Sequence, residues 1–331
     1  MKRNEILKYR SVWLGIAMLW TIWYHSGIHS SFSLLSNIKQ VGYGGVDIFL
    51  FASGVGCYFS LDKNQNIGSF VKRRFLRLGP TYFCFMLIWV IYKIIMAHIP
   101  AQAILGNLLG IQDLTGRGNG FNWYISALVI LYLLAPYFKI CADKVSNGWK
   151  QGFVILFLLL CSVPFWNVNL YMIIVTRLPV FYVGMLFARF CKKDGDLSGK
   201  TVLILSLISV IGMVLLWLSY HFFRDYLWAY GLHWYPFLLI VPGLCMLISY
   251  VFHGISKWRM GRFTASVLAV IGDYSFEIYL VHVMVFEIFK YLINTLKAID
   301  NSLLIWGAAI LCTGIGSVGL RGVTNLLCKR K

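Results

Sequence analysis

Four ionisable side chains lie deep inside apolar stretches, and their types suit proton transfer and charge stabilisation. They are His25, Asp47, Arg177 and Glu277. A charged group inside a membrane is costly, so each of them predicts a functional site with a partner. The nearest basic residues at the predicted cytoplasmic boundary are, respectively, Arg10, Lys63, Lys192 and Arg262. At ~1.5 Å per helical residue, each of the four side chains lies about 22–24 Å from its reference residue. We therefore expect all four to share one layer in the outer third of the bilayer.

Histidine is the residue type that we expect to act as a base in this layer. The imidazole of His25 titrates near neutral pH, which suits removal of a hydroxyl proton, and Asp47 or Glu277 could orient it or balance its charge. His282 follows Glu277 by five residues, which places the two about 140° apart around a helix. A catalytic pair must therefore cross helices. The alternative is that these groups only cross-link helices by hydrogen bonds.

A second candidate site lies in the basic run KRRFLR at residues 72–77. Arg74 and Arg77 are spaced i and i+3, so they project from one face of a helix. Their guanidinium groups, with Arg73 beside them, suit bidentate binding of phosphate. The alternative is that the run serves only as a topology signal.

The composition indicates a membrane protein. Of the 331 residues, 59% are hydrophobic and 13% are charged, against about 25% charged residues in soluble domains. The net charge, 30 basic minus 12 acidic residues, is +18. On a soluble protein this charge would suggest nucleic acid, but here the basic residues form short runs between apolar stretches, as in proteins oriented in a bilayer. We therefore expect a lipid bilayer and no nucleic acid as partner.

We expect an all-α, polytopic helical bundle of about ten transmembrane helices, formed by residues 1–331 as a single domain with no appended soluble domain. A helix needs about 20 apolar residues to cross a bilayer. Stretches of this kind occur at residues 11–28, 44–61, 78–97, 123–141, 151–166, 171–190, 201–221, 233–252, 265–289 and 303–327. With the N-terminus in the cytoplasm, 23 of the 30 basic residues fall in inner segments, five in outer segments and two within spans. Both termini are therefore predicted to be cytoplasmic.

Cysteine spacing predicts neither disulfides nor a metal site. The eight cysteines stand singly, mostly in apolar runs, without a CxxC pair. Isolated buried thiols behave as small hydrophobic residues. We expect no metal, since zinc ligands would have to come from separate helices.

Six stretches, in order, resemble acyltransferase family 3, the integral membrane O-acyltransferases. They are LGIAMLWTIWYHSG (14–27), GGVDIFLFASGVGCYFSL (44–61), KRRFLRLGPTYF (72–83), NWYISALVILYLLAPYF (122–138), RLPVFYVGMLFA (177–188) and GDYSFEIYLVH (272–282). The resemblance implies transfer of an acyl group, usually acetyl, from cytoplasmic acyl-CoA to a hydroxyl of an extracytoplasmic or lipid-linked sugar. It also implies a multi-pass protein of the plasma membrane.

The resemblance assigns roles to individual residues. His25 matches the catalytic histidine, and Arg74 and Arg77 match an Arg-x-x-Arg element on the CoA side. Together with the charge arguments, the expected catalytic residues are His25, Asp47 and Glu277, the expected donor-binding residues are Arg10, Arg73, Arg74 and Arg77, and the expected acceptor-binding residues are Asn122, Trp123, Arg177, Tyr279 and His282.

The sequence departs from the family at one position. The family commonly has an arginine eleven residues before the histidine, where this chain has Leu14; the nearest arginine, Arg10, lies one helical turn earlier. Either Arg10 substitutes for it, or the acyl donor is bound by other groups.

Several alternatives remain open at this point. His25 could act as a general base, or it could carry the acyl group as a covalent intermediate. A proton-coupled exporter of a sugar or small molecule would use the same buried charges without consuming acyl-CoA. A signalling or assembly protein would use them only to pack helices.

Overall fold

The computed structural model describes residues 1–28, 30–97, 101–109, 123–145, 147–165, 169–229, 231–296 and 302–328. No β-strand occurs in these ranges; a single isolated bridge joins Lys2 and Asp196. The helices are α1 (Arg10–His25), α2 (Ser33–Gln40), α3 (Gly45–Lys63), α4 (Ile67–Ala97), α5 (Ala101–Leu108), α6 (Trp123–Lys144), α7 (Gly148–Leu160), α8 (Asn169–Val175), α9 (Leu178–Lys192), α10 (Gly199–Phe222), α11 (Arg224–Ala229), α12 (Pro236–Ile255), α13 (Arg259–Asp273), α14 (Ser275–Leu296) and α15 (Ser302–Leu327). Short 3-10 helices are η1 (Arg3–Tyr9), η2 (Gly42–Gly44), η4 (Val163–Phe165) and η5 (Leu232–Trp234).

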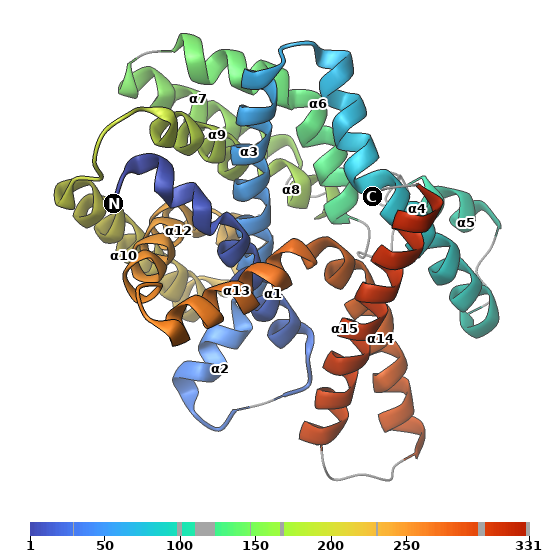
Figure 1. The fold of residues 1–331 in the computed structure, drawn as a ribbon. Coiled ribbons are helices and arrows are strands. Elements are labelled where there is room, and N and C mark those ends of the chain that lie inside the picture. The colour runs from blue at the N-terminus through green and yellow to red at the C-terminus, as the bar shows by residue number, and fades with distance from the viewer. Residues whose placement is uncertain are drawn as a thin grey trace.

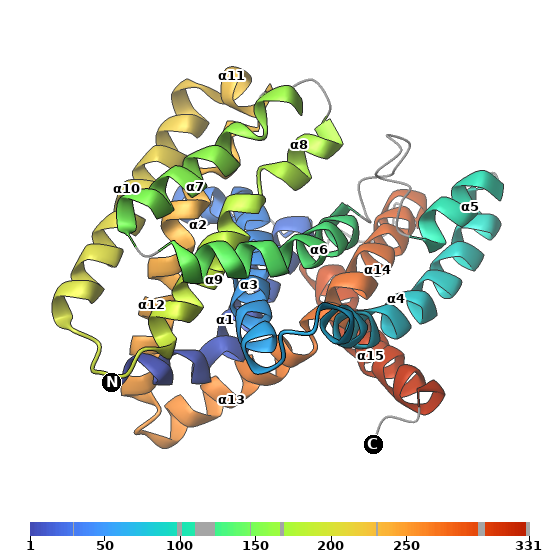
Figure 2. The same ribbon diagram turned by 90° about the horizontal axis from the view of Figure 1, so that it is seen from above.

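The helices form the polytopic bundle that the sequence predicts. Within the described residues, eight helices are long and apolar enough to cross a membrane, and they correspond to eight of the ten predicted spans. The two views place α10 and α12 on one side of the molecule and the pair α14 and α15 on the other, with α3 between them (Figures 1 and 2).

The first predicted span, 11–28, is shorter than expected. Helix α1 ends at His25, because Ser26 adopts an extended backbone conformation. Its 16 residues pack closely against α13 through two glycines. A Cβ atom on Gly15 would lie 2.0 Å from the Leu268 carbonyl oxygen, and one on Gly272 would lie 1.8 Å from that of Ser11. Only residues without a side chain allow the two backbones to approach this closely.

The ninth predicted span, 265–289, is wrong as a continuous helix. It is divided at Tyr274 into α13 and α14. Helix α13 crosses α1, held there by a hydrogen bond from Ser11 Oγ to Asp273 Oδ1 at 2.7 Å, whereas α14 turns away alongside α15 (Figure 1). A count of residues from Arg262 therefore does not give the depth of Glu277.

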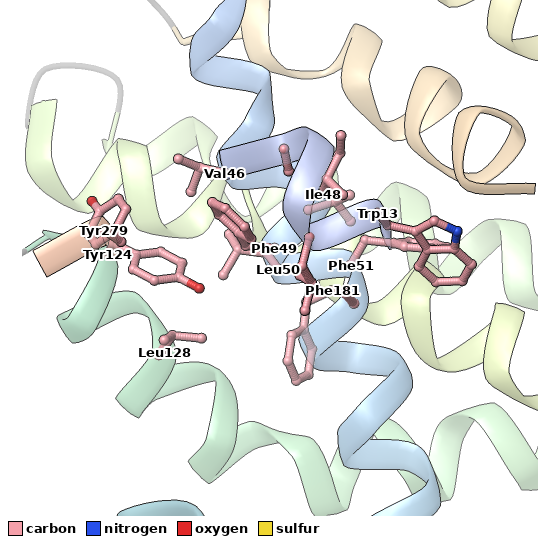
Figure 3. Packing of buried hydrophobic residues seen from close by; sticks show 14 of the residues in the cluster. Trp13, Val46, Ile48, Phe49, Leu50, Phe51, Tyr124, Leu128, Phe181 and Tyr279 are labelled. Atoms are coloured by element: carbon pink, nitrogen blue, oxygen red, sulfur yellow. The ribbon is translucent and has the colours of Figure 1, made fainter. Parts of the chain in front are cut away.

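The core surrounds α3, which carries glycines at its closest helix contact. A Cβ atom on Gly54 would lie 2.1 Å from the Phe181 carbonyl oxygen, and one on Gly184 of α9 would lie 2.2 Å from that of Phe51. Large rings fill the space around this contact, and the rings of Tyr124 and Tyr279 meet at the far side of α3 (Figure 3). The central helices are thus fixed by backbone contact, which holds their polar side chains in defined positions.

Candidate active site

Three arginines from two helices line one pocket, which we call the arginine pocket. Its empty space, with the open solvent at its mouth included, is about 520 Å³. Its lining includes Arg10, Arg74, Arg77, Tyr124, Tyr132 and Tyr279. Helix α4 begins at Ile67, eleven residues before the predicted span, so Arg74 and Arg77 lie on the helix itself. Their i, i+3 spacing directs both into the same pocket, as the sequence predicts.

Gly56 of α3 makes room for two of these guanidinium groups. Arg74 Nη2 donates a hydrogen bond to the Gly56 carbonyl oxygen at 2.8 Å, and Arg10 Nε donates one to that of Ala52 at 3.1 Å. A Cβ atom on Gly56 would lie 3.2 Å from Arg10 Nη2 and 4.0 Å from Arg74 Nη1. Arg74 is 8% exposed, and its Nε has no hydrogen-bond partner among the described residues. Positive groups held this way provide donors for an anion with several oxygens.

The structure also clarifies the departure from the family at Leu14. Leu14 and Arg10 both line the arginine pocket, one helical turn apart on α1. Arg10 therefore brings a guanidinium group to the same pocket that Leu14 lines. Arg73 does not line this pocket; it donates hydrogen bonds to the carbonyl and hydroxyl oxygens of Ser60, at 3.2 and 3.4 Å.

One face of α14 leads from the arginine pocket to a second pocket. Phe276 and Tyr279 line the first, and Val283, Phe286 and Lys290 line the second, at helical spacings of three and four residues. Residues at this spacing form a continuous stripe. The second, which we call the histidine pocket, has about 710 Å³ of empty space and is lined by His25, Trp89, Lys93, Val283, Phe286, Glu287 and Lys290.

A row of aromatic rings extends from the arginine pocket to the histidine pocket. The ring centroids of Tyr124 and Tyr279 are 4.7 Å apart, those of Tyr279 and His282 are 5.5 Å apart, and those of His282 and His25 are 5.1 Å apart. Figure 3 shows the first two rings beside Phe49. The row begins in the arginine pocket and ends at His25 in the histidine pocket.

The two histidines form a pair whose protons are fixed by backbone carbonyl groups. His282 Nδ1 lies 2.7 Å from the Tyr279 carbonyl oxygen, which can only accept, so this nitrogen carries the proton and Nε2 carries a lone pair. His25 Nδ1 lies 3.2 Å from that Nε2 and 3.0 Å from the Thr21 carbonyl oxygen. Two acceptors facing one nitrogen require His25 Nδ1 to be the donor. In the neutral form of His25, Nε2 is then unprotonated, which is the state that a general base needs.

Asp47 and Arg177 form a separate buried pair. Their side chains are 3% and 2% exposed, and Asp47 Oδ1 lies 3.8 Å from Arg177 Nε. The guanidinium carbon lies 3.9 Å from the ring centroid of Trp234 and 5.1 Å from that of Trp123. The predicted acceptor-binding residues Trp123 and Arg177 are thus in contact. Asn122, predicted for the same role, lies outside the described residues.

Neither Asp47 nor Glu277 is hydrogen-bonded to His25 among the described residues, so a role for either carboxylate in orienting His25 or balancing its charge stays a prediction. In the described chain, the hydrogen-bond partners of His25 are Thr21 and His282. Glu277 accepts two hydrogen bonds from Arg321 of α15, each 2.9 Å long. The expected common layer stays a prediction for Glu277, because the break at Tyr274 interrupts the helix along which its depth was counted.

Sequence reasoning missed several residues of the site. Tyr124 and Tyr132 line the arginine pocket with Leu128, and their spacing of four along α6 is a signal that could have identified them. Arg321 is one of the 23 basic residues in the predicted inner segments, and nothing in its spacing indicates its partner. No cluster of three His, Cys, Asp or Glu side chains that could hold a metal occurs in the described part of the chain.

Comparison with known protein families agrees with this arrangement. A family model described as an acyltransferase domain, that of acyltransferase family 3, matches residues 15–321. Neither a curated protein nor a solved structure matches the chain. The matched residues include His25, His282 and the three arginines of α4, while Arg10 and Leu14 lie just before them. The match covers nearly the whole chain, so this integral membrane protein belongs to acyltransferase family 3.

Proposed function

We propose that this membrane acyltransferase moves an acyl group, in the simplest case acetyl, from acyl-CoA to a hydroxyl of an extracytoplasmic or lipid-linked sugar. The observation that carries the proposal is the order of groups along α14: the arginine pocket, Tyr279, the two histidines and the histidine pocket. An anion site and a base at opposite ends of one row suit a donor whose phosphates lie far from its thioester. Acetyl-CoA is such a donor.

In this proposal the arginine pocket binds the phosphates of the donor. Arg10 and Arg74 are held by carbonyl groups of α3, and Arg77 is exposed at the same pocket. Guanidinium forks bind phosphate oxygens bidentately, in a geometry that an ammonium group cannot reproduce. The pantetheine arm then extends past Tyr124 and Tyr279 toward His25.

His25 acts as the general base. Its unprotonated Nε2 takes the proton of the acceptor hydroxyl while the hydroxyl oxygen forms a bond to the thioester carbonyl carbon. The carbon–sulfur bond then breaks, and the proton passes from His25 to the departing thiolate of CoA. His282 accepts the Nδ1 proton of His25 as a hydrogen bond and so stabilises the imidazolium that forms. In the alternative acyl-histidine relay, His25 Nε2 attacks the thioester carbonyl carbon first and the carbon–sulfur bond breaks. The acceptor hydroxyl oxygen then takes the acyl group from His25, and its proton goes to the thiolate of CoA.

Asp47, Arg177 and Trp123 do not contact His25, and we place them in binding of the acceptor. Tyr24 connects the two regions: its ring centroid lies 4.9 Å from that of His25 and 5.9 Å from that of Tyr43, which precedes Asp47 by one turn. Glu277 is assigned to packing, since Arg321 satisfies both of its oxygens.

The charge distribution supports a plasma-membrane orientation with both termini in the cytoplasm. Acyl-CoA then approaches the arginine pocket from the cytoplasm, and the acceptor enters the histidine pocket from outside. In inside-out vesicles, added acetyl-CoA is expected to be consumed, whereas sealed right-side-out vesicles should leave it intact. Equal consumption from both faces would contradict this orientation.

The experiment that tests the function compares His25→Gln with the wild type in cells and in isolated membranes. Mass spectrometry of surface glycans should detect a hydroxyl-linked acyl group with the wild type and none with His25→Gln. The matched control is His221→Gln, since His221 is an exposed histidine at the end of α10. Full activity of His25→Gln would refute the proposal. Sugar export without consumption of acetyl-CoA would establish the exporter instead.

The donor site has its own test. Arg74→Lys/Arg77→Lys keeps both charges but removes the forks, so the KM for acetyl-CoA should rise roughly ten- to a hundredfold while the protein still inserts. Arg73→Lys is the matched control, because Arg73 lies outside the arginine pocket. An unchanged KM in the double variant would leave the basic run as a topology signal.

A further inference from the structure

The histidine pocket carries a net positive charge from the lysines that line it. Two lysines line it, Lys93 of α4 and Lys290 of α14, together with one carboxylate, Glu287. Lys93 Nζ forms an ion pair with Glu287 Oε1, so these two charges offset each other. Lys290 is exposed and forms no ion pair with any residue that the structure describes. The pocket therefore carries one uncompensated positive charge close to His25.

A third lysine lies near this charge. Lys39 of α2 donates a hydrogen bond to the Ser26 carbonyl oxygen at 2.8 Å, immediately after His25 in the chain. Burial, followed by repulsion from Lys290, lowers the pKa of the Lys39 ammonium group. Two ammonium groups close enough to repel each other are retained at the same mouth, although no acidic side chain there binds Lys39 or Lys290 within the described residues.

These lysines also stand apart from most basic residues of the chain in their predicted side of the membrane. Only seven of the 30 basic residues lie outside the segments predicted to be cytoplasmic, since 23 lie within them. Lys39, Lys93 and Lys290 are three of those seven. The positive-inside rule gives basic residues no topological purpose at this end of the molecule. Lys93 and Lys290 line one pocket, and Lys39 is bonded to the residue after His25 at its edge, so the three together point to a ligand that they attract.

We propose that the acceptor admitted to the histidine pocket is an anionic sugar, one that carries a carboxylate or a phosphate group near the hydroxyl that is acylated. Lys290 binds the anion of the acceptor, Lys39 adds to the positive field at the mouth, and the Lys93–Glu287 pair sets the net charge of the wall. A neutral sugar would leave Lys290 without a counter-charge in the pocket, so the arrangement discriminates between acceptors by charge. The inference rests on the proposed function in that it takes this pocket as the acceptor site.

The test measures sugar binding without requiring catalysis. Saturation-transfer difference NMR on the full chain in lipid nanodiscs compares methyl glucuronide, glucose 6-phosphate and the neutral methyl glucoside as probes. We expect both anionic probes to bind roughly two- to fivefold more tightly than the neutral probe, as an ion pair at an exposed lysine allows. The ratio between the two anionic probes identifies the carboxylate or the phosphate as the preferred group.

Two variants change the charge of the pocket in opposite directions. Lys290→Gln should remove the preference for anionic probes, and Glu287→Gln, which frees Lys93, should increase it. Lys200→Gln is the matched control, because Lys200 is exposed at the start of α10, which contributes no residue to this pocket. A double variant with both pocket substitutions should return close to the preference of the wild type, since one positive charge again remains.

Each other outcome counts against the inference. Equal binding of charged and neutral probes, binding of none of them, or a preference unchanged in Lys290→Gln would overturn it. A loss of bound anionic lipid in Lys290→Gln, with sugar preference unaffected, would identify a lipid headgroup as the ligand instead. Because binding is measured without acyl transfer, a charge preference in a protein that fails to transfer acetyl would refute the proposed reaction and leave only a binding site for anionic sugars in this pocket.

Discussion

Two acid–arginine pairs cross-link the helices of this protein, and they are built differently. Arg321 donates two hydrogen bonds of 2.9 Å to the two oxygens of Glu277. Arg177 and Asp47 approach no closer than 3.8 Å, and neither Asp47 Oδ2 nor Arg177 Nε has a hydrogen-bond partner among the described residues. The Glu277–Arg321 pair, which has the shorter contacts, is also the more exposed: the Arg321 side chain is 27% exposed and that of Arg177 only 2%.

The difference indicates separate roles. Unsatisfied charged atoms in a buried site carry a desolvation cost, so a loose pair deep in the protein is not explained by stability. Arg177 is instead compensated by the faces of Trp234 and Trp123 and by bonds from Nη1 to the Ile173 carbonyl and Thr176 hydroxyl oxygens. We infer that Glu277 and Arg321 hold α14 against α15, and that Asp47 and Arg177 keep hydrogen-bonding capacity for a ligand.

The largest effect on the free energy of unfolding is expected when the Glu277–Arg321 pair is broken; we call it the tight pair, and Asp47–Arg177 the loose pair. Glu277→Leu leaves the Arg321 guanidinium partly buried without its carboxylate, which should lower the free energy of unfolding by about 2–3 kcal/mol. Glu277→Leu/Arg321→Leu should recover most of this loss, because both charges are then absent. Equilibrium unfolding in mixed micelles measures both. A double variant as unstable as the sum of the single variants would show that the pair does not act as a unit.

The loose pair should respond in the opposite way. Asp47→Asn should lower the free energy of unfolding by less than about 1 kcal/mol, because Arg177 keeps its aromatic and carbonyl partners. The rate of acyl transfer should nevertheless fall by roughly tenfold or more, equivalent to about 1.4 kcal/mol. Glu277→Gln is the matched control: it should destabilise more and affect the rate of the folded fraction less. The contrast between the pairs is lost if both variants change stability and rate in the same proportion.

Prediction from sequence worked where a rule acts within one helix. The i, i+3 spacing places Arg74 and Arg77 on one face of their helix, and both line one pocket. Arg10 and Leu14 are spaced i and i+4 on one face of α1, so both line that pocket as well. The membrane class and eight of the spans follow from runs of apolar residues, which depend on composition alone. Each of these features is local.

Prediction failed where the answer depends on contacts between distant segments. Counting residues from Arg262 assumed a straight helix through Tyr274, but α13 packs across α1 at Gly272 and Ser11 and ends at Asp273. The partner of His25 is His282, 257 residues away in the sequence, and the partner of Glu277 is Arg321 in the last helix. Spacing within a segment carries no information about such pairs.

Trp234 tests how far an aromatic ring compensates the buried charge of Arg177 in the Asp47–Arg177 pair. Its ring centroid lies 3.9 Å from the Arg177 guanidinium carbon, which is almost fully buried. Trp234→Leu should therefore lower the free energy of unfolding by about 1 kcal/mol more in the Asp47→Asn background than in the wild type, because the ring is then the main compensation for the charge. A double-mutant cycle on unfolding measures this coupling, with Trp149→Leu, an exposed tryptophan of α7, as the control. Strict additivity would argue that the ring does not compensate the guanidinium.

The smallest effect is expected at the ring that accompanies the tight pair. The guanidinium carbon of Arg321 lies 3.6 Å from the ring centroid of Tyr274, closer than the corresponding contact at Trp234. Distance alone would make Tyr274 the stronger partner, but Arg321 is more exposed and already has a bidentate carboxylate, so the ring adds to a satisfied charge. Tyr274→Leu should therefore cost only about 0.5 kcal/mol, and Tyr274→Phe, which keeps the ring, less still. Measured by the same unfolding experiment, a loss at Tyr274 as large as the one at Trp234 would mean that ring distance, and not the quality of the ion pair, determines how much each arginine depends on its aromatic neighbour.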